Sequence, residues 1–191
     1  MQDGEKPVWI LHVDGSSTSG GSGVGLVLQG PHNAKISYVL KFSFDVSNNE
    51  AEYEAEYEAL VAGLKFVKDI GAEKIEILSD SMLIVQQLKG EYEAKDDGMI
   101  KYLQVVRSLV SEFQYWNITK VPRSENSETD RLAKYATVAI PNPEKFEDRI
   151  FVEFLPTKST DRKLPKSCQL KQFFRVMLQK APVPKQIGLT G

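Results

Sequence analysis

The segment VWILHV, residues 8–13, is apolar at both alternating sets of positions. A strand with one wet face alternates apolar and polar side chains, so a continuous apolar run is typical of a strand covered on both faces. Such a strand belongs in the middle of a sheet. This feature predicts a layered fold with residues 8–13 at its centre.

Together with the segments after it, this strand predicts the element order βββαβααβα, which is an α/β pattern. A glycine-rich loop at 15–23 is expected to lead into two further strands of an antiparallel meander, at 24–30 and 35–44. The later elements are a long helix from near Ser47 to Gly71, a strand at 74–80, helices at 81–90 and 99–113, a strand at 113–122 and a closing helix at 126–140. We therefore predict one domain over residues 7–140.

Residues 141–191 have a different character. They contain several prolines and one short amphipathic piece near 170–180, so we predict a largely irregular linker or adaptor segment. Residues 154–191 hold eight Lys/Arg and one Asp, a net charge of +7, which leaves −9 for the rest of a chain whose total is −2. The segment is basic and could contact phosphates, although a solvated linker is the simpler interpretation.

The composition narrows the kinds of site that the chain can hold. Cys168 is the single cysteine, and His12 and His32 are the two histidines, so the residues offer no thiolate or imidazole cluster for zinc. Any metal must therefore be held by oxygen atoms.

The sequence shows no apolar run long enough to span a membrane and no signal-peptide pattern. A cytosolic or nuclear setting without a membrane partner is therefore expected.

Acidic residues stand where predicted strands end or predicted helices begin. Asp14 follows the strand at 8–13, and taken by itself it could be explained as part of an Asp-Gly turn. Asp80 stands where the N-cap of a helix would lie. Asp130 could close a capping box with Ser127. The complete set is Asp14, the pair Glu52 and Glu56, Asp80 and Asp130.

The order of elements can place Asp14 and Asp80 at the C-terminal ends of neighbouring parallel strands. Like charges that converge there destabilise the fold unless a cation neutralises them. Carboxylate oxygens favour Mg²⁺, with Mn²⁺ as a substitute, and two ions about 3.5–4 Å apart suit in-line cleavage of a phosphodiester. The sequence therefore predicts a two-ion nuclease site.

Four short motifs occur along the chain in a fixed order: VDGSS at 13–17, NNEAEYEA at 48–55, LSDS at 78–81 and NSETDRLAK at 126–134. Together they resemble the type 1 ribonuclease H family, in the version carried by gypsy-type LTR retrotransposon polyproteins. The resemblance extends over roughly residues 7–140.

This resemblance implies a ribonuclease H-like fold, with a five-stranded mixed sheet flanked by helices. It implies hydrolysis of the RNA strand of an RNA–DNA hybrid, with reverse transcriptase and integrase regions of the same polyprotein as partners. The implied catalytic metal ligands are Asp14, one of Glu52 and Glu56, Asp80 and Asp130. Contacts to the minor groove of the hybrid are implied for Gly15, Ser16, Ser17, Asn48 and Asn49.

The family pattern has the sequence AEYE once, whereas this chain has it twice in tandem, at 51–54 and 55–58. Four extra helical residues add about 400° of rotation and about 6 Å of rise, so Glu52 and Glu56 point nearly the same way. Counting from Asn49 selects Glu52 as the ligand, whereas counting back from the apolar body of the helix selects Glu56. We favour Glu56, because burial of that body fixes the helix on the sheet.

Arg123 stands in the loop where many cellular relatives have a histidine, and we place it among the substrate-binding residues. Two alternatives to the ribonuclease remain. One is a catalytically impaired, connection-type nucleic-acid-binding module whose duplicated turn displaces the glutamate. The other is a related nuclease, such as an integrase or exonuclease, but its motifs would occur in a different order.

Overall fold

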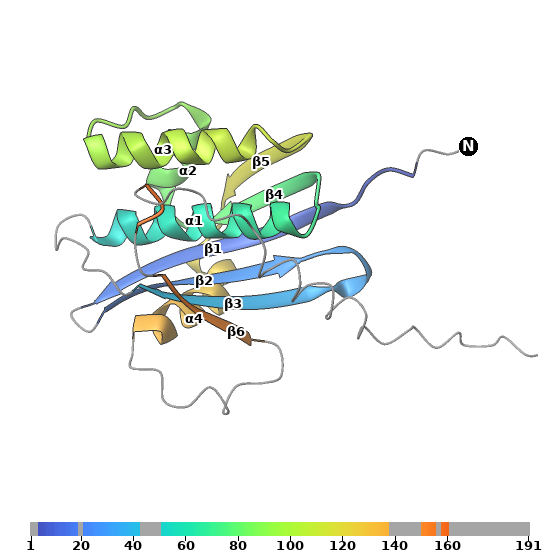
Figure 1. The fold of residues 1–191 in the computed structure, drawn as a ribbon, viewed down its shortest axis with the longest axis horizontal. Coiled ribbons are helices and arrows are strands. Elements are labelled where there is room, and N and C mark those ends of the chain that lie inside the picture. The colour runs from blue at the N-terminus through green and yellow to red at the C-terminus, as the bar shows by residue number, and fades with distance from the viewer. Residues whose placement is uncertain (1–3, 19–20, 43–50, 138–149, 156–157, 161–191) are drawn as a thin grey trace, which may run out of the picture.

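The computed structural model describes residues 4–18, 21–42, 51–137, 150–155 and 158–160 (Figure 1). Its strands form one sheet in the order β5-β4-β1-β2-β3-β6. Strands β1, β2 and β3 form an antiparallel meander, while β4 and β5 run parallel to β1, and β6 runs parallel to β3. The strands are β1 (Val8–Thr18), β2 (Gly21–Gln29), β3 (Lys35–Phe42), β4 (Lys74–Ser79), β5 (Tyr115–Lys120) and β6 (Ile150–Leu155).

Helices cover the sheet from both sides. Leu26 and Leu28 of β2 join the large core beneath α1, α2 and α3, whereas Val27 between them joins a smaller core beneath α4. Neighbouring strand residues face opposite ways, so α4 lies on the other face from the first three helices. The helices are α1 (Ala51–Asp69), α2 (Met82–Lys89), α3 (Asp97–Val110) and α4 (Ser127–Thr137), with short 3₁₀ turns η1 (Pro31–Asn33) and η2 (Arg123–Asn126).

The predicted α/β fold and its five strands are confirmed, and β1 has two strands on one side and three on the other. Leu11 and Val13 of β1 are buried against the α1 side, whereas Ile10 and His12 are only partly buried on the other face. The double covering predicted for β1 is therefore complete on one face and partial on the other. In α1, Ala, Glu and Leu favour the helix, which is followed by Gly71 in the left-handed conformation (φ +83°). Its predicted start near Ser47 lies outside the described residues.

The prediction of a loop over residues 15–23 was wrong. Strand β1 continues to Thr18 and β2 begins at Gly21, and the ladder pairs Gly15 with Val24 and Ser17 with Ser22. Glycine here serves close packing: a Cβ on Gly23 would lie 2.2 Å from the Cβ of Ala136 in α4. The glycines allow helices to lie against the strands, which a composition-based loop prediction does not detect.

The sheet also has a sixth strand that the sequence analysis did not predict. Strand β6 lies within residues 141–191, which we expected to be largely irregular, and pairs with β3 from Ser37↔Ile150 to Phe42↔Leu155. Residues 150–155 are thus a regular element within a segment that we expected to be largely irregular. Among the described residues, no helix combines the length and apolar character required to cross a bilayer.

Candidate active site

Three of the predicted acidic side chains converge beside the central strand. Asp14 lies in β1, Glu56 in the second turn of α1, and Asp80 directly after β4. One carboxyl oxygen from each lies within 4.8 Å of the other two. The parallel pairing of β1 and β4, with Val13 opposite Ser79, carries Asp14 and Asp80 to the same edge.

Gly15 brings α1 close enough for Glu56 to reach this group. A Cβ on Gly15 would lie 2.4 Å from the Ala55 carbonyl carbon and 2.4 Å from the Glu56 nitrogen, which is too close for any side chain. The backbone N–H of Gly15 also donates a hydrogen bond to the Glu56 carboxyl group and partly offsets the rise in its pKa. The strand thus contacts the helix directly at the residue that carries the third carboxylate.

The electrostatics of the site favour the protonated forms of Asp14 and Glu56 while no cation is bound. Burial, followed by the charges of Asp80 and Asp130, raises the pKa of Asp14 to about 7. Burial and the charges of Asp14 and Asp80 raise the pKa of Glu56 well above its usual range. Clustered carboxyl groups that resist ionisation are typical of a functional site rather than of surface charge.

Asp130 approaches the trio from the opposite layer, in the first turn of α4. It hydrogen-bonds Asp14, and its Oδ2 accepts a hydrogen bond of 2.8 Å from Lys134 one turn later. Arg123, whose side chain is 80% exposed, reaches Asp80 with an Nε to Oδ2 distance of 3.5 Å. Two cationic groups therefore flank the acidic cluster.

These groups surround a cavity of about 220 Å³. It is lined by Asp14, Gly15, Ser16, Ser17, Glu56, Arg123, Asp130 and Lys134. The substrate-binding residues predicted on β1 and at 123 thus lie with the carboxylates. Asn48 and Asn49 lie outside the described residues, as does the side chain of Glu52, whose backbone lies in the first turn of α1.

Sequence reasoning missed two residues of the site. Lys134 lines the cavity, and its spacing of four from Asp130 on a helix could have indicated it. Asn126 is buried, and its Nδ2 donates a hydrogen bond of 3.1 Å to the Val13 carbonyl oxygen. That bond connects η2, which contains Arg123, to the residue before Asp14. The two bonded residues are 113 positions apart, so no local sequence pattern could have indicated the contact.

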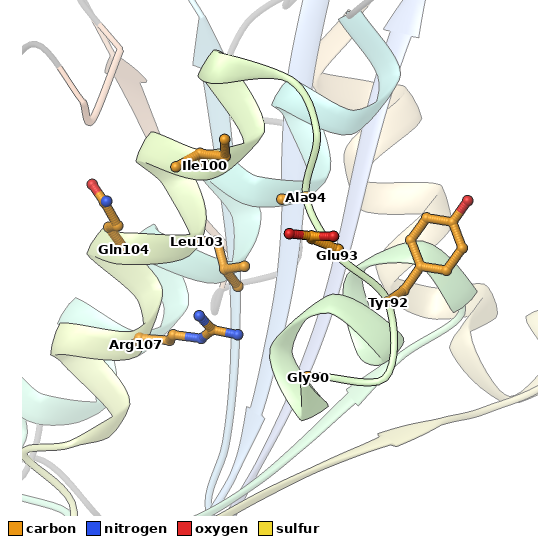
Figure 2. A pocket seen from close by; sticks show the side chains of 8 residues that line it. All are labelled: Gly90, Tyr92, Glu93, Ala94, Ile100, Leu103, Gln104 and Arg107. Carbon is orange, nitrogen blue, oxygen red and sulfur yellow. The ribbon is translucent and has the colours of Figure 1, made fainter.

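A larger cavity of about 500 Å³ lies elsewhere, between α2, α3 and their connection (Figure 2). Figure 2 shows Leu103 and Arg107 on α3 and Glu93 on the connecting loop. Arg107 donates a hydrogen bond of 3.4 Å to the Gln87 carbonyl oxygen, so its guanidinium group already has a partner within the protein. The smaller cavity is the better candidate site, because it gathers the carboxyl groups with perturbed pKa values.

The donor set fits a hard divalent cation. Oxygens of three carboxyl groups converge, and Oε2 of Glu56 is buried with no hydrogen-bond partner among the described residues. Mg²⁺ and Mn²⁺ prefer such oxygen ligands, and a bound cation would remove the repulsion that raises both pKa values. Asp14, Glu56 and Asp80 can hold a metal, with Asp130 beside them.

Comparison with known proteins places this geometry in a family. Residues 12–136 match the family described as reverse transcriptase-like. Ribonuclease HI of Halobacterium salinarum is 36% identical over 92 residues, 48% of this chain and 46% of that protein. The bifunctional protein Rv2228c of Mycobacterium tuberculosis is 33% identical over 129 residues, 66% of this chain and 35% of that protein.

Solved structures agree with the sequence matches. The crystal structure of RNase H1 from Halobacterium salinarum has a TM-score of 0.62 at 30% identity and covers 68% of this chain and 96% of its own. The N-terminal RNase H domain of Rv2228c has a TM-score of 0.59 at 27% identity, with coverage of 69% and 94%. The chain spans less than half the length of the two curated relatives described above. It belongs to the reverse transcriptase-like family and contains a ribonuclease H-like domain.

Proposed function

We propose that this domain is a metal-dependent endonuclease that hydrolyses the RNA strand of RNA–DNA hybrids. The observation that carries the proposal is the convergence of Asp14, Glu56 and Asp80, whose carboxyl oxygens lie within 4.8 Å of one another beside a cavity. Membership of a family whose relatives include ribonucleases HI and H1 supports the choice of substrate.

The roles of the residues follow from their places in the site. Asp14, Glu56, Asp80 and Asp130 would hold two Mg²⁺ ions, or Mn²⁺ in their place. Such ions, when bound, lower the pKa of an attacking water and neutralise the leaving oxygen. Burial and mutual repulsion raise the pKa values of Asp14 and Glu56, so metal binding must compete with protons for these two groups.

Binding of the hybrid is assigned to the rim of the cavity. Gly15, Ser16 and Ser17 line the cavity, and the serine hydroxyl groups are of the kind that contacts 2′-hydroxyl groups in a minor groove. Arg123 and Lys134 line the same cavity and supply positive charge for phosphates. Asn48 and Asn49 are assigned to the same groove on the resemblance alone.

We also propose that the domain derives from a gypsy-type LTR retrotransposon polyprotein, with reverse transcriptase and integrase regions as its partners. The order of the four motifs supports this origin, as does the reverse transcriptase-like family match. A cytosolic or nuclear setting follows from the same proposal.

The test is cleavage of a hybrid labelled on both strands, in Mg²⁺ and in Mn²⁺, with Asp14→Asn as the blank. Cleavage of the RNA strand alone, lost in the variant, is expected. A hybrid that is bound but never cut would instead support the connection-type module. Cleavage of double-stranded DNA or RNA in preference to the hybrid would support a different nuclease.

The choice between the two glutamates is tested by Glu56→Gln against Glu52→Gln. We expect Glu56→Gln to lower kcat by at least about a hundredfold, the usual scale for losing a group that stabilises transition-state charge. Glu52→Gln should cost much less. The reverse ranking would show that the first copy of AEYE supplies the ligand.

A further inference from the structure

Two buried carboxyl groups of α1 are not part of the acidic cavity. Glu58 has no exposed surface, and Glu54 is 3% exposed. They lie two residues to either side of Glu56, and residues two apart on an α-helix point about 200° apart. Glu54 and Glu58 therefore lie on the face of α1 opposite Glu56.

The partners of these groups come from the C-terminal part of the chain. We call residues 158–160 the strap. Both carboxyl oxygens of Glu58 accept hydrogen bonds from Ser159: Oε1 from its backbone N–H at 2.6 Å, and Oε2 from its hydroxyl group. Lys158 Nζ donates to Glu54 Oε1 at 2.7 Å. Hydrogen bonds in which one partner is charged are among the stronger polar contacts in proteins.

Helix α3 holds the same turn of α1. The Tyr102 hydroxyl group donates a hydrogen bond of 2.8 Å to Glu58 Oε1, and the Tyr102 ring stacks on Tyr57 with centroids 5.4 Å apart. The hydroxyl group of Tyr53, in the first copy of AEYE, donates to Asp96 Oδ1 at 3.0 Å. Both copies of AEYE therefore make hydrogen bonds to α3 or to the residue that caps it.

This arrangement opposes a specific force. The Glu56 carboxyl group lies within 4.8 Å of those of Asp14 and Asp80. When these groups ionise to take up a metal ion, like charges at that distance push α1 away from β1. The buried apolar body of α1 and the hydrogen bond from Gly15 to Glu56 hold the helix on the sheet. The contacts on the opposite face of the helix add to this hold at the turn that carries Glu56.

We propose that Lys158 and Ser159 are positioning residues for Glu56, because the strap clamps the duplicated turn of α1 and holds the Glu56 carboxyl group at the acidic site. The strap follows β6, and both lie beyond residues 12–136, the part that matches the family. The duplication supplies the extra turn, and the C-terminal extension supplies its clamp. The inference rests on the proposed function only in treating Glu56 as a metal ligand.

The test compares Lys158→Met and Ser159→Ala in the full chain with two controls. Lys158→Arg keeps the positive charge. Lys68→Met removes an ion pair with Glu112 at the other end of the same helix. Mg²⁺ affinity is measured by calorimetry without substrate, and amide hydrogen exchange is measured over residues 53–58 in the metal-free protein. All measurements are made well below the lowest unfolding temperature, so that every variant is folded.

We expect Lys158→Met and Ser159→Ala to weaken Mg²⁺ binding by up to about tenfold, the lower end of the range for residues that orient metal ligands. Exchange over residues 53–58 should become faster. On the hybrid, the Mg²⁺ concentration for half-maximal cleavage should rise while kcat at saturating Mg²⁺ changes little. Both controls should match the wild type in Mg²⁺ affinity.

Unchanged Mg²⁺ affinity in both strap variants would overturn the positioning role, even if their unfolding temperatures fell as for any lost contact. Equal losses in Lys68→Met would also overturn it, since the effect would then be general. If the wild type neither binds Mg²⁺ nor cleaves the hybrid while the strap variants speed exchange over residues 53–58, the proposed function fails and the clamp is supported.

Discussion

A buried aspartate with a pKa of about 7 gives the metal-free protein an uncommon dependence on pH. Asp14 ordinarily titrates near 3.8, so between about pH 4 and 7 the folded protein holds a proton that the unfolded chain has released. A state that binds the extra proton is favoured by acid. The contribution of Asp14 to stability is full below about pH 4 and is lost as the pH rises to about 7.

The first prediction follows from this difference. In EDTA, the unfolding temperature of the wild type relative to Asp14→Asn should fall as the pH rises from 5 to 8. Each unit of pKa difference is worth about 1.4 kcal/mol. Calorimetry on both proteins measures it. The comparison cancels groups that Asp14 does not perturb, such as His12, whose pKa burial lowers. A pH-independent difference would contradict the pKa assigned to Asp14.

A second prediction concerns Lys134. Because its ammonium group lines the acidic cavity, we expect Lys134→Met to weaken binding of the hybrid and to lower the salt dependence of log K by about one unit of slope. Fluorescence anisotropy at several salt concentrations measures this, in an Asp14→Asn background that prevents cleavage. Lys101→Met, on the exposed side of α3, serves as the matched control. Equal slopes for the two variants would remove Lys134 from the binding surface.

At the scale of elements, the site depends on how closely helices lie against the sheet. Gly15 allows α1 to touch β1, and Gly25 does the same for α4, since a Cβ there would lie 2.2 Å from the Thr129 carbonyl oxygen. One glycine thus sets the distance to Glu56 and the other sets the distance to Asp130. Each contact is made with backbone atoms, which cannot turn aside as a flexible side chain can.

The third prediction is that Gly15→Ala displaces α1. The added methyl group should destabilise the fold by about 1–3 kcal/mol, as overpacking does, and should abolish Mg²⁺ binding by moving Glu56. Gly25→Ala should destabilise to a similar degree but leave the trio of Asp14, Glu56 and Asp80 in place, so Mg²⁺ binding should persist. Thermal unfolding and calorimetry distinguish the two. Retained Mg²⁺ binding in Gly15→Ala would contradict the assigned contact.

The elements that could be predicted from the sequence are those with strong local periodicity. The five strands from β1 to β5 and the four helices follow from runs of apolar residues, and the apolar body of α1 favoured Glu56 over Glu52. Strand β6 lies in a proline-rich segment, and its partner β3 is more than a hundred residues away in the sequence. No local sequence pattern therefore predicted it. The contact of Ser159 with Glu58, across 101 residues, is of the same kind.

At the scale of the whole molecule, the residues after α4 join two distant parts of the fold. Strand β6 pairs with the edge of β3. The strap then reaches α1, which lies on the same face of the sheet as α3 (Figure 1). The pairing covers backbone groups that would otherwise form an open sheet edge. The compact unit therefore extends past residue 140, the boundary that the sequence suggested.

The fourth prediction tests this extension by comparing chains that end at residue 149 and at residue 160. The shorter chain lacks β6 and the strap, so Glu58 loses its Ser159 partners, at about 1–3 kcal/mol for each buried group left without a hydrogen bond. It should unfold at lower temperature and self-associate through β3. Calorimetry and light scattering measure both effects. Equal behaviour of the two chains would show that the extension adds nothing to the fold.

The tandem AEYE also bears on how such a domain can change during evolution. The body of α1 is fixed by the sheet, so an in-frame duplication of four codons lengthens the helix at its N-terminal end. One added turn leaves the new residues only about 40° out of phase with the old ones, whereas two added residues would reverse the face. Insertions of whole turns are therefore the ones that selection can retain here. Each one moves the preceding chain about 6 Å along the helix axis while a glutamate stays at the site.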